Sequence, residues 1–274
     1  EQKLDVRLLA KLGLKPGKRN LKSWQEFVTK IRALDKPLKI AMVGKYFGTG
    51  DFMLADSYVS VIEAAKHAIW NANLKPQFTW IDSETYEKNP DKVSGLSDFD
   101  GVIVPGGFGS RGIEGIITAI RYVREHSIPY LGLCYGMQLA TVEFARNVVK
   151  LNGANTAEVD DAAPHQIIHI MPDQEKKLLK LEYGGTMRLG AYPAKLQKGS
   201  VVAKAYGTDT VSERQRHRYE VNNAYREQLK RSGLVISGTS PDGGLVEIIE
   251  LPSTTHPFFV GTQFHPEFKS RPLS

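Results

Sequence analysis

The chain has 274 residues, of which 41% are hydrophobic and 24% are charged, and this supplies enough apolar material for a sizeable buried core. No apolar stretch approaches the ~20 residues that a membrane-spanning helix needs and no signal peptide is recognisable, so we expect no membrane association. The single cysteine cannot form an internal disulfide, which suits a reducing, cytoplasmic location.

The formal charge of +6 originates in the first 37 residues, which hold ten Lys or Arg and four Asp or Glu. Residues 8–12 predict a short helix, and Ser23 with Glu26 forms the pattern of a capping box for a second one. No nucleic-acid recognition motif or aromatic stacking surface accompanies the charge, so we expect no nucleic-acid binding. We interpret residues 1–37 as a basic helical interdomain linker and residues 38–274 as the folded domain.

From Pro37 onward, strand-like and helix-like segments alternate. This alternation predicts an α/β fold, with a mostly parallel central sheet covered by helices on both faces and a site at the carboxyl ends of the strands. Strands are expected at 39–43, 78–81, 102–105 and 129–133, and helices at 57–70 and 113–125.

The third of these strands leads into the glycine loop Pro105-Gly106-Gly107-Phe108-Gly109. A loop of this kind is often only a turn. At the carboxyl end of a strand, however, the backbone N–H of Gly107 is suited to bind an oxyanion.

The only cysteine lies in Gly132-Leu133-Cys134-Tyr135-Gly136, between a short apolar strand and a mostly apolar helix. This pattern is typical of a nucleophile elbow, in which glycines allow a tight strand-to-helix turn. The helix N-terminus stabilises a thiolate, and the N–H of Tyr135 is a natural second oxyanion donor. We therefore predict that Cys134 is a catalytic nucleophile rather than a buried apolar residue.

After residue 160 the pattern changes to strands separated by turns, which predicts antiparallel additions to the sheet. These strands are expected at 167–170, 201–206, 234–238 and 245–249. His165 and His169 lack a third ligand, so we expect no metal site.

The segment 259–264 predicts a core strand that ends at His265-Pro266-Glu267. In an extended segment residues i and i+2 point the same way, so Glu267 is expected to hold the imidazole of His265 in one tautomer. Cys134, His265 and Glu267 would then form a catalytic triad.

The glycine loop, the cysteine motif extended to Met137-Gln138, and Phe264-His265-Pro266-Glu267-Phe268 resemble the three signatures of the class I, triad-type glutamine amidotransferases. Within that superfamily the chain is most similar to the C-terminal glutaminase domain of the CTP synthase family. The additional matches are Val43-Gly44-Lys45-Tyr46, Asp56-Ser57-Tyr58, Gly184 to Gly190 and Arg216 to Asn223. The resemblance runs from about residue 38 to the end and implies a flavodoxin-like fold.

The resemblance also implies the roles of single residues. The glutamine substrate would be held by a set of seven: Gly107, Tyr135, Gly136, Met137, Gln138, Glu158 and Arg218. A zwitterionic amino acid indeed requires one cation and one carboxylate, which Arg218 and Glu158 would supply. The stretch Gly184 to Gly190 resembles a lid over the glutamine site, where GTP is an allosteric activator and Arg188 is a regulatory candidate.

As implied partners, the family has an N-terminal synthase (amidoligase) domain, in which ATP and Mg²⁺ act to aminate UTP to CTP, and it forms homo-oligomers. No cofactor is expected in the glutaminase domain itself. The link 47–55 is longer than is usual in the family, and the C-terminal end is shorter. Three alternatives remain open: the amidotransferase subunit of another synthetase, a cysteine hydrolase of the same fold acting on other γ-glutamyl substrates, and a non-catalytic assembly module.

Overall fold

A computed structural model of the chain describes residues 3–15, 17, 20–45, 48–49, 52–53, 58–170 and 187–273. Most of the expected link 47–55 and the first part of the expected lid, residues 184–186, lie outside the described residues. None of the described helices is long and apolar enough to cross a membrane.

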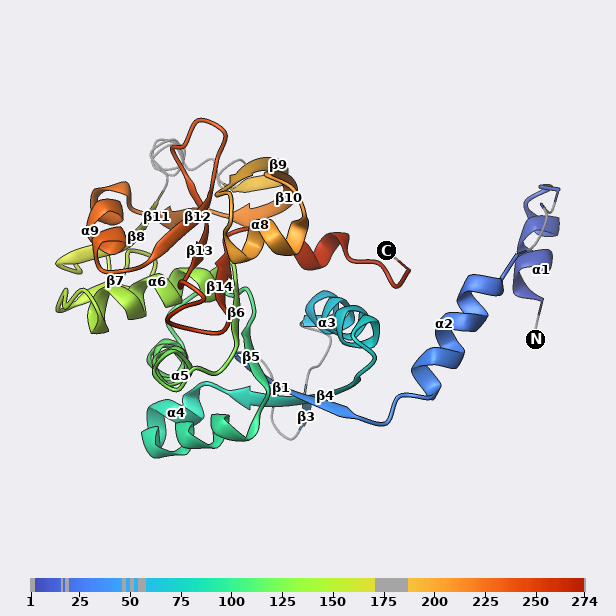
Figure 1. Cartoon of the computed structure of the whole chain (residues 1–274), viewed down its shortest axis with the longest axis horizontal. Coiled ribbons are helices and arrows are strands. Elements are labelled where there is room, and N and C mark those ends of the chain that lie inside the picture. The colour runs from blue at the N-terminus through green and yellow to red at the C-terminus, as the bar shows by residue number, and fades with distance from the viewer. Residues whose placement is uncertain are drawn as a thin grey trace.

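The chain alternates helices and strands as far as residue 147 and is richer in strands after it (Figure 1). The helices are α1 (Leu4–Lys11), α2 (Lys22–Arg32), α3 (Val59–Asn71), α4 (Glu84–Lys88), α5 (Ile113–Glu125), α6 (Tyr135–Asn147), α8 (Val201–Tyr206) and α9 (Arg226–Arg231). The strands are β1 (Pro37–Gly44), β2 (Gly48–Thr49), β3 (Phe52–Met53), β4 (Lys75–Asp82), β5 (Gly101–Val104), β6 (Tyr130–Leu133), β7 (Ala154–Thr156), β8 (His165–Ile170), β9 (Arg188–Leu196), β10 (Thr210–His217), β11 (Tyr219–Val221), β12 (Val235–Thr239), β13 (Val246–Glu250) and β14 (Phe259–Thr262).

One sheet of nine strands organises the domain, in the order β10-β9-β12-β13-β14-β6-β5-β1-β4. The five strands from β14 to β4 run parallel to one another. The strands from β14 back to β10 are antiparallel neighbours. A parallel half therefore continues into an antiparallel half, as the sequence pattern predicts, with β14 at the boundary between them.

Helices cover both faces of this sheet (Figure 1). On one face, α5 and α6 bury apolar side chains against β1, β5 and β6 in the largest core cluster. On the opposite face, Val61 and Ile69 of α3 pack against Ile40, Met42 and Ile103. Burial on both faces explains why the central strands consist almost entirely of apolar residues.

The helices α1 and α2 extend away from the sheet (Figure 1). An edge-on contact between the rings of Phe27 and Trp70, with centroids 5.7 Å apart, joins α2 to α3. The expected capping box is wrong, because Ser23 lies inside α2 and the N-cap residue is Leu21. The Lys22 N–H donates instead to Asn20 Oδ1 at 3.1 Å.

The expected strand at 201–206 is also wrong, because these residues form helix α8. The hydroxyl of Ser200 accepts a hydrogen bond from the Ala203 N–H, and the carboxylate of Glu250 accepts from the N–H groups of Val201 and Val202. These interactions satisfy the first-turn donors of a helix, so they outweigh the strand preference of the two valines.

Candidate active site

Cys134 occupies the turn between β6 and α6 in a backbone conformation that is rare for residues other than glycine. Its φ is 51° and its ψ is −97°, and helix α6 begins at the next residue. The Cys134 N–H donates to the carbonyl of Thr262 at 2.6 Å, which ties the turn to β14. Strained backbone of this kind concentrates at functional sites, and here it supports the predicted nucleophile elbow.

The glycines around Cys134 are required because neighbouring atoms leave no room for a side chain. A Cβ on Gly136 would lie 2.3 Å from the carbonyl oxygen of Val104, and one on Gly132 would lie 2.7 Å from the backbone of Gly136. Gly261 on β14 is equally confined, since its Cβ would come within 2.9 Å of the Met137 side chain. Strands β5, β6 and β14 therefore approach α6 at backbone contact distance.

The predicted base and its orienting acid are in contact. The Nδ1 atom of His265 lies 2.7 Å from Oε1 of Glu267, and both residues are buried. The expected reason was wrong, however, because Glu267 belongs to the 3₁₀ turn Pro266–Lys269 rather than to an extended segment. The turn folds Glu267 back onto the imidazole ring.

The environment of His265 favours its charged form. Burial by itself lowers the pKa of His265, but the interactions with Cys134 and with Glu267 outweigh burial and raise this pKa to about 10. Its Nε2 makes no hydrogen bond of good geometry with any described residue. Nε2 is therefore the nitrogen that can exchange a proton with the sulfur and with a leaving amine.

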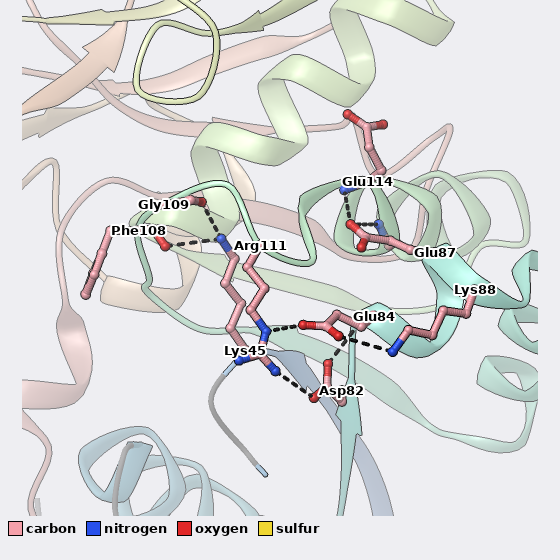
Figure 2. Close-up of polar contacts among 10 residues, drawn as sticks. Lys45, Asp82, Glu84, Glu87, Lys88, Phe108, Gly109, Arg111 and Glu114 are labelled. Atoms are coloured by element: carbon pink, nitrogen blue, oxygen red, sulfur yellow. Dashed lines mark hydrogen bonds and ion pairs between the residues drawn. The ribbon is translucent and has the colours of Figure 1, made fainter. Parts of the chain in front are cut away.

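Three groups hold the glycine loop by its residue Gly109, whose φ of 76° suits a glycine. The Gly109 carbonyl accepts hydrogen bonds from Lys45 Nζ at 2.5 Å and from the Tyr135 hydroxyl at 2.8 Å. The Gly109 N–H donates to Glu158 Oε1 at 2.9 Å. Figure 2 shows the Lys45 amine directed at the Gly109 and Phe108 carbonyls, the latter at 3.2 Å.

Lys45 reaches these carbonyls from the end of β1 and is almost fully buried. Its Nζ also lies 4.7 Å from the centroid of the Tyr135 ring. Burial lowers the pKa of Lys45 to about 8, although Glu158 and Glu87 oppose the shift. Beside it, Arg111 forms ion pairs with Asp82 and Glu84 (Figure 2), which fix the chain that continues from the loop toward α5.

A cavity of about 780 Å³ opens beside Cys134, a size that accommodates a small amino-acid substrate. Its walls bring together the triad and four of the expected binding residues, namely Gly107, Gln138, Glu158 and Arg218. The Nε atom of Arg218 is buried without a hydrogen-bond partner among the described residues. Burial raises the pKa of Glu158, while the Gly109 N–H, Lys45 and Arg218 oppose that shift.

The expected binding residues of the cysteine motif contribute differently. Gly136 and Met137 are packed in the core and do not line the cavity, so no side-chain contact of theirs reaches a ligand there. Gln138 lines the cavity, but its Nε2 already donates to the Tyr219 carbonyl and to Gln263 Oε1. The Tyr135 hydroxyl holds the glycine loop, and its backbone N–H lies in the first turn of α6, where amides lack intrahelical acceptors.

Arg188 is the first residue of β9, and its guanidinium is largely buried. It forms an ion pair with the fully buried Glu247 at 2.6 Å and stacks on the Tyr192 ring at 4.5 Å. The side chain of Arg188 therefore points inward from the strand and not to solvent.

Two residues of the site carry roles that the sequence patterns left unassigned. Lys45 was noted only as part of a resemblance, and Gln263 only as part of a strand. Gln263 is buried, and its Nε2 lies 3.6 Å from the Cys134 sulfur. A glutamine within a predicted core strand, two residues before His265, is the one signal that could have singled it out.

Comparison with known proteins agrees with this geometry. Residues 53–274 match the glutamine amidotransferase class-I family. The CTP synthase of Rubrobacter xylanophilus is 51% identical over 98% of this chain and 47% of its own length, and that of Carboxydothermus hydrogenoformans is 52% identical over 99% and 49%. The chain thus spans about half the length of these curated relatives.

The glutaminase domain of Trypanosoma brucei CTPS, solved with bound acivicin, superposes with a TM-score of 0.78 at 39% identity. The match covers 86% of this chain and 88% of that one. The likeness therefore extends over nearly the whole of the solved domain.

Proposed function

The chain belongs to the class-I glutamine amidotransferase family, and from this premise we propose that it is the glutaminase half of a CTP synthase. It releases ammonia from L-glutamine, and a synthase half, in which ATP and Mg²⁺ act, uses the ammonia to convert UTP to CTP. The observation that carries the proposal is the placement of Cys134, on a strained elbow, in one cavity with His265 and Glu267.

In the first half-reaction, the Cys134 sulfur bonds to the γ-carbonyl carbon of glutamine. The backbone N–H groups of Gly107 and Tyr135 stabilise the negative oxygen of the tetrahedral intermediate. The carbon–nitrogen bond then breaks, with His265 Nε2 supplying the proton that lets ammonia depart. Glu267 keeps the ring oriented through Nδ1 and stabilises its charged form.

In the second half-reaction, His265 Nε2 takes a proton from water, whose oxygen attacks the thioester carbon. The carbon–sulfur bond breaks, which releases glutamate and returns the thiolate. Arg218 and Glu158 would bind the α-carboxylate and the α-ammonium of the substrate, since they face the same cavity with opposite charges.

The experiment that tests this function is mass spectrometry after incubation with a glutamine analogue that carries an electrophile. We expect one adduct, on Cys134, and none in Cys134→Ala, which should lose ammonia release by several powers of ten while remaining folded. Ammonia release from Cys134→Ala at the parental rate would refute the mechanism.

GTP activation and homo-oligomer formation complete the proposal. We propose that GTP acts on the stretch 184–190, of which residues 187–190 are described, and that the isolated chain hydrolyses glutamine slowly. In the enzyme with its synthase half restored, Arg188→Ala should reduce the GTP stimulation and spare CTP formation from added ammonium. Full activity of the isolated chain, insensitive to GTP and to the synthase half, would contradict it. Analytical ultracentrifugation tests the oligomer.

A further inference from the structure

The Cys134 sulfur contacts two groups of the protein, a buried side-chain amide and a backbone carbonyl. Gln263 Nε2 lies 3.6 Å away and the backbone carbonyl oxygen of Arg216 lies 3.8 Å away. The carbonyl is only an acceptor, so it favours a protonated sulfur that donates to it. A side-chain N–H pointing at the sulfur has the opposite effect, because it stabilises a sulfur that bears negative charge.

Hydrogen-bond directions determine which end of the Gln263 amide faces the sulfur. The Tyr219 carbonyl can only accept, so the atom 2.9 Å from it must be the Nε2 of Gln138. The second proton of this Nε2 points to Gln263 Oε1 at 3.2 Å. Rotating the Gln263 amide by 180° would remove this acceptor and direct an oxygen at the sulfur. The chain from Tyr219 through Gln138 therefore leaves the N–H end of Gln263 toward Cys134.

Gln263 approaches the sulfur from a side that the substrate does not need. It is 1% exposed and does not line the cavity, whereas Cys134, His265 and Gly107 do. A buried side-chain amide is costly unless its groups are bonded, and the sulfur is the partner that this N–H has.

We propose that Gln263 is a further catalytic residue, which donates a side-chain N–H to the Cys134 sulfur and stabilises the thiolate that attacks the substrate. The proposal rests on the proposed function, in which this sulfur is the nucleophile. When the thioester forms, the sulfur loses its charge and the hydrogen bond weakens. Hydrolysis of the thioester restores the charge, so Gln263 stabilises the sulfur both as nucleophile and as leaving group.

The test replaces Gln263 by methionine, which has similar length but no donor, and follows alkylation of Cys134 by iodoacetamide as a function of pH. The variant retains the other charged and histidine side chains on the cavity, so a changed profile reports the amide. These are Glu158, Arg216, His217, Arg218, His265 and Glu267. At pH 7 we expect alkylation to slow about tenfold, the effect of one hydrogen bond to a charged group. At high pH, where the sulfur is ionised in both proteins, the difference should disappear.

The glutamine kinetics separate this role from a structural one. In Gln263→Met, kcat should fall by a similar factor, whereas KM should stay within about twofold, because Gln263 does not touch the substrate cavity. The matched control is Thr141→Val in α6. It removes a buried hydrogen bond from the Thr141 hydroxyl to the Met137 carbonyl, and this bond does not involve the Cys134 sulfur. An alkylation profile of Gln263→Met that coincides with the parent's would overturn the proposal.

If Gln263→Met does not fold, a measurement on the parent protein tests the same proposal. The side-chain ¹⁵N signal of Gln263, identified by its shift on alkylation of Cys134, should move with the same pH midpoint as the alkylation rate. A signal indifferent to that midpoint would equally overturn the proposal. Failure of the proposed function would appear differently, as ammonia release that persists in Cys134→Ala whatever the alkylation profile of Gln263→Met.

Discussion

Gly106→Ala should disable catalysis without unfolding the domain. A Cβ at this position would lie 2.9 Å from Cε1 of His265 and 3.7 Å from Cβ of Cys134. Nonbonded carbon atoms need about 3.5 Å, so the imidazole must retreat by roughly half an ångström or more. It cannot retreat freely, because its Nδ1 lies 2.7 Å from Oε1 of Glu267.

A displacement of this size is large for a proton-transfer group. Misplacing a catalytic group by about 1 Å costs about 100-fold in rate, so we expect kcat for ammonia release to fall roughly 10- to 100-fold. The φ of Gly106 is not left-handed, so alanine adds no backbone strain and the thermal midpoint should stay close to the parent's. Gly95→Ala, where a Cβ meets no atom within 4 Å, is the control. A kcat of Gly106→Ala within twofold of the parent's would refute this reasoning.

Three further outcomes follow from the site. Glu267→Gln should reduce kcat less than His265→Ala, because Glu267 orients the base and does not itself transfer the proton; equal losses would contradict that assignment. Arg218→Ala and Glu158→Ala should each mainly raise KM for glutamine, with a loss of binding free energy on the order of 2 to 5 kcal/mol. Unchanged KM values would show that neither residue binds the substrate. Burial raises the pKa of Glu220 from 4.5 to about 7, so between these pH values the folded state binds more protons than the unfolded state and stability falls as pH rises. Urea unfolding of Glu220→Gln should lack this fall, which is on the order of 3 kcal/mol at most; an unaltered pH slope would contradict the shift.

The sequence predicted best the parts of the fold in which one local pattern dominates. The central parallel strands β1, β5, β6 and β14 are mostly buried, so their apolar runs and the alternating helices could be recognised without knowledge of tertiary contacts. The elbow was equally visible, because the close approach of α6 to β5 and β6 excludes any residue but glycine at positions 132 and 136.

Strand β10 was missed because its inward face is mostly polar. Its buried side chains belong to Val211, Glu213, Gln215 and His217. Burial therefore alternates along the strand, but apolar and polar residues do not alternate with it. Gln215 and His217 bond to each other, and Gln215 also bonds to Glu247 on another strand. Gln215 and Glu247 lie far apart in the chain, so their hydrogen bond leaves no signal in the local sequence.

The sequence indicated which residues gather at the candidate site, but it indicated their geometry less well. The three predicted triad residues line one cavity, but the contact of Glu267 with His265 depends on a turn that we had interpreted as extended chain. The role of Gln263 depends on the orientation of Gln138, and the hold of Lys45 on the loop depends on where β1 lies in the sheet. Such roles are set by packing between segments and cannot be read from spacing alone.

The position of β14 in the sheet has a consequence for biosynthesis. Although it is the last strand of the chain, it lies between β6 and β13 and supplies the carbonyl that holds the Cys134 turn. A chain still emerging from the ribosome without residues 259–267 lacks both the base and the central strand beside the elbow. The site therefore cannot assemble until β14 has inserted between β6 and β13, and a long-range insertion of this kind makes folding slow.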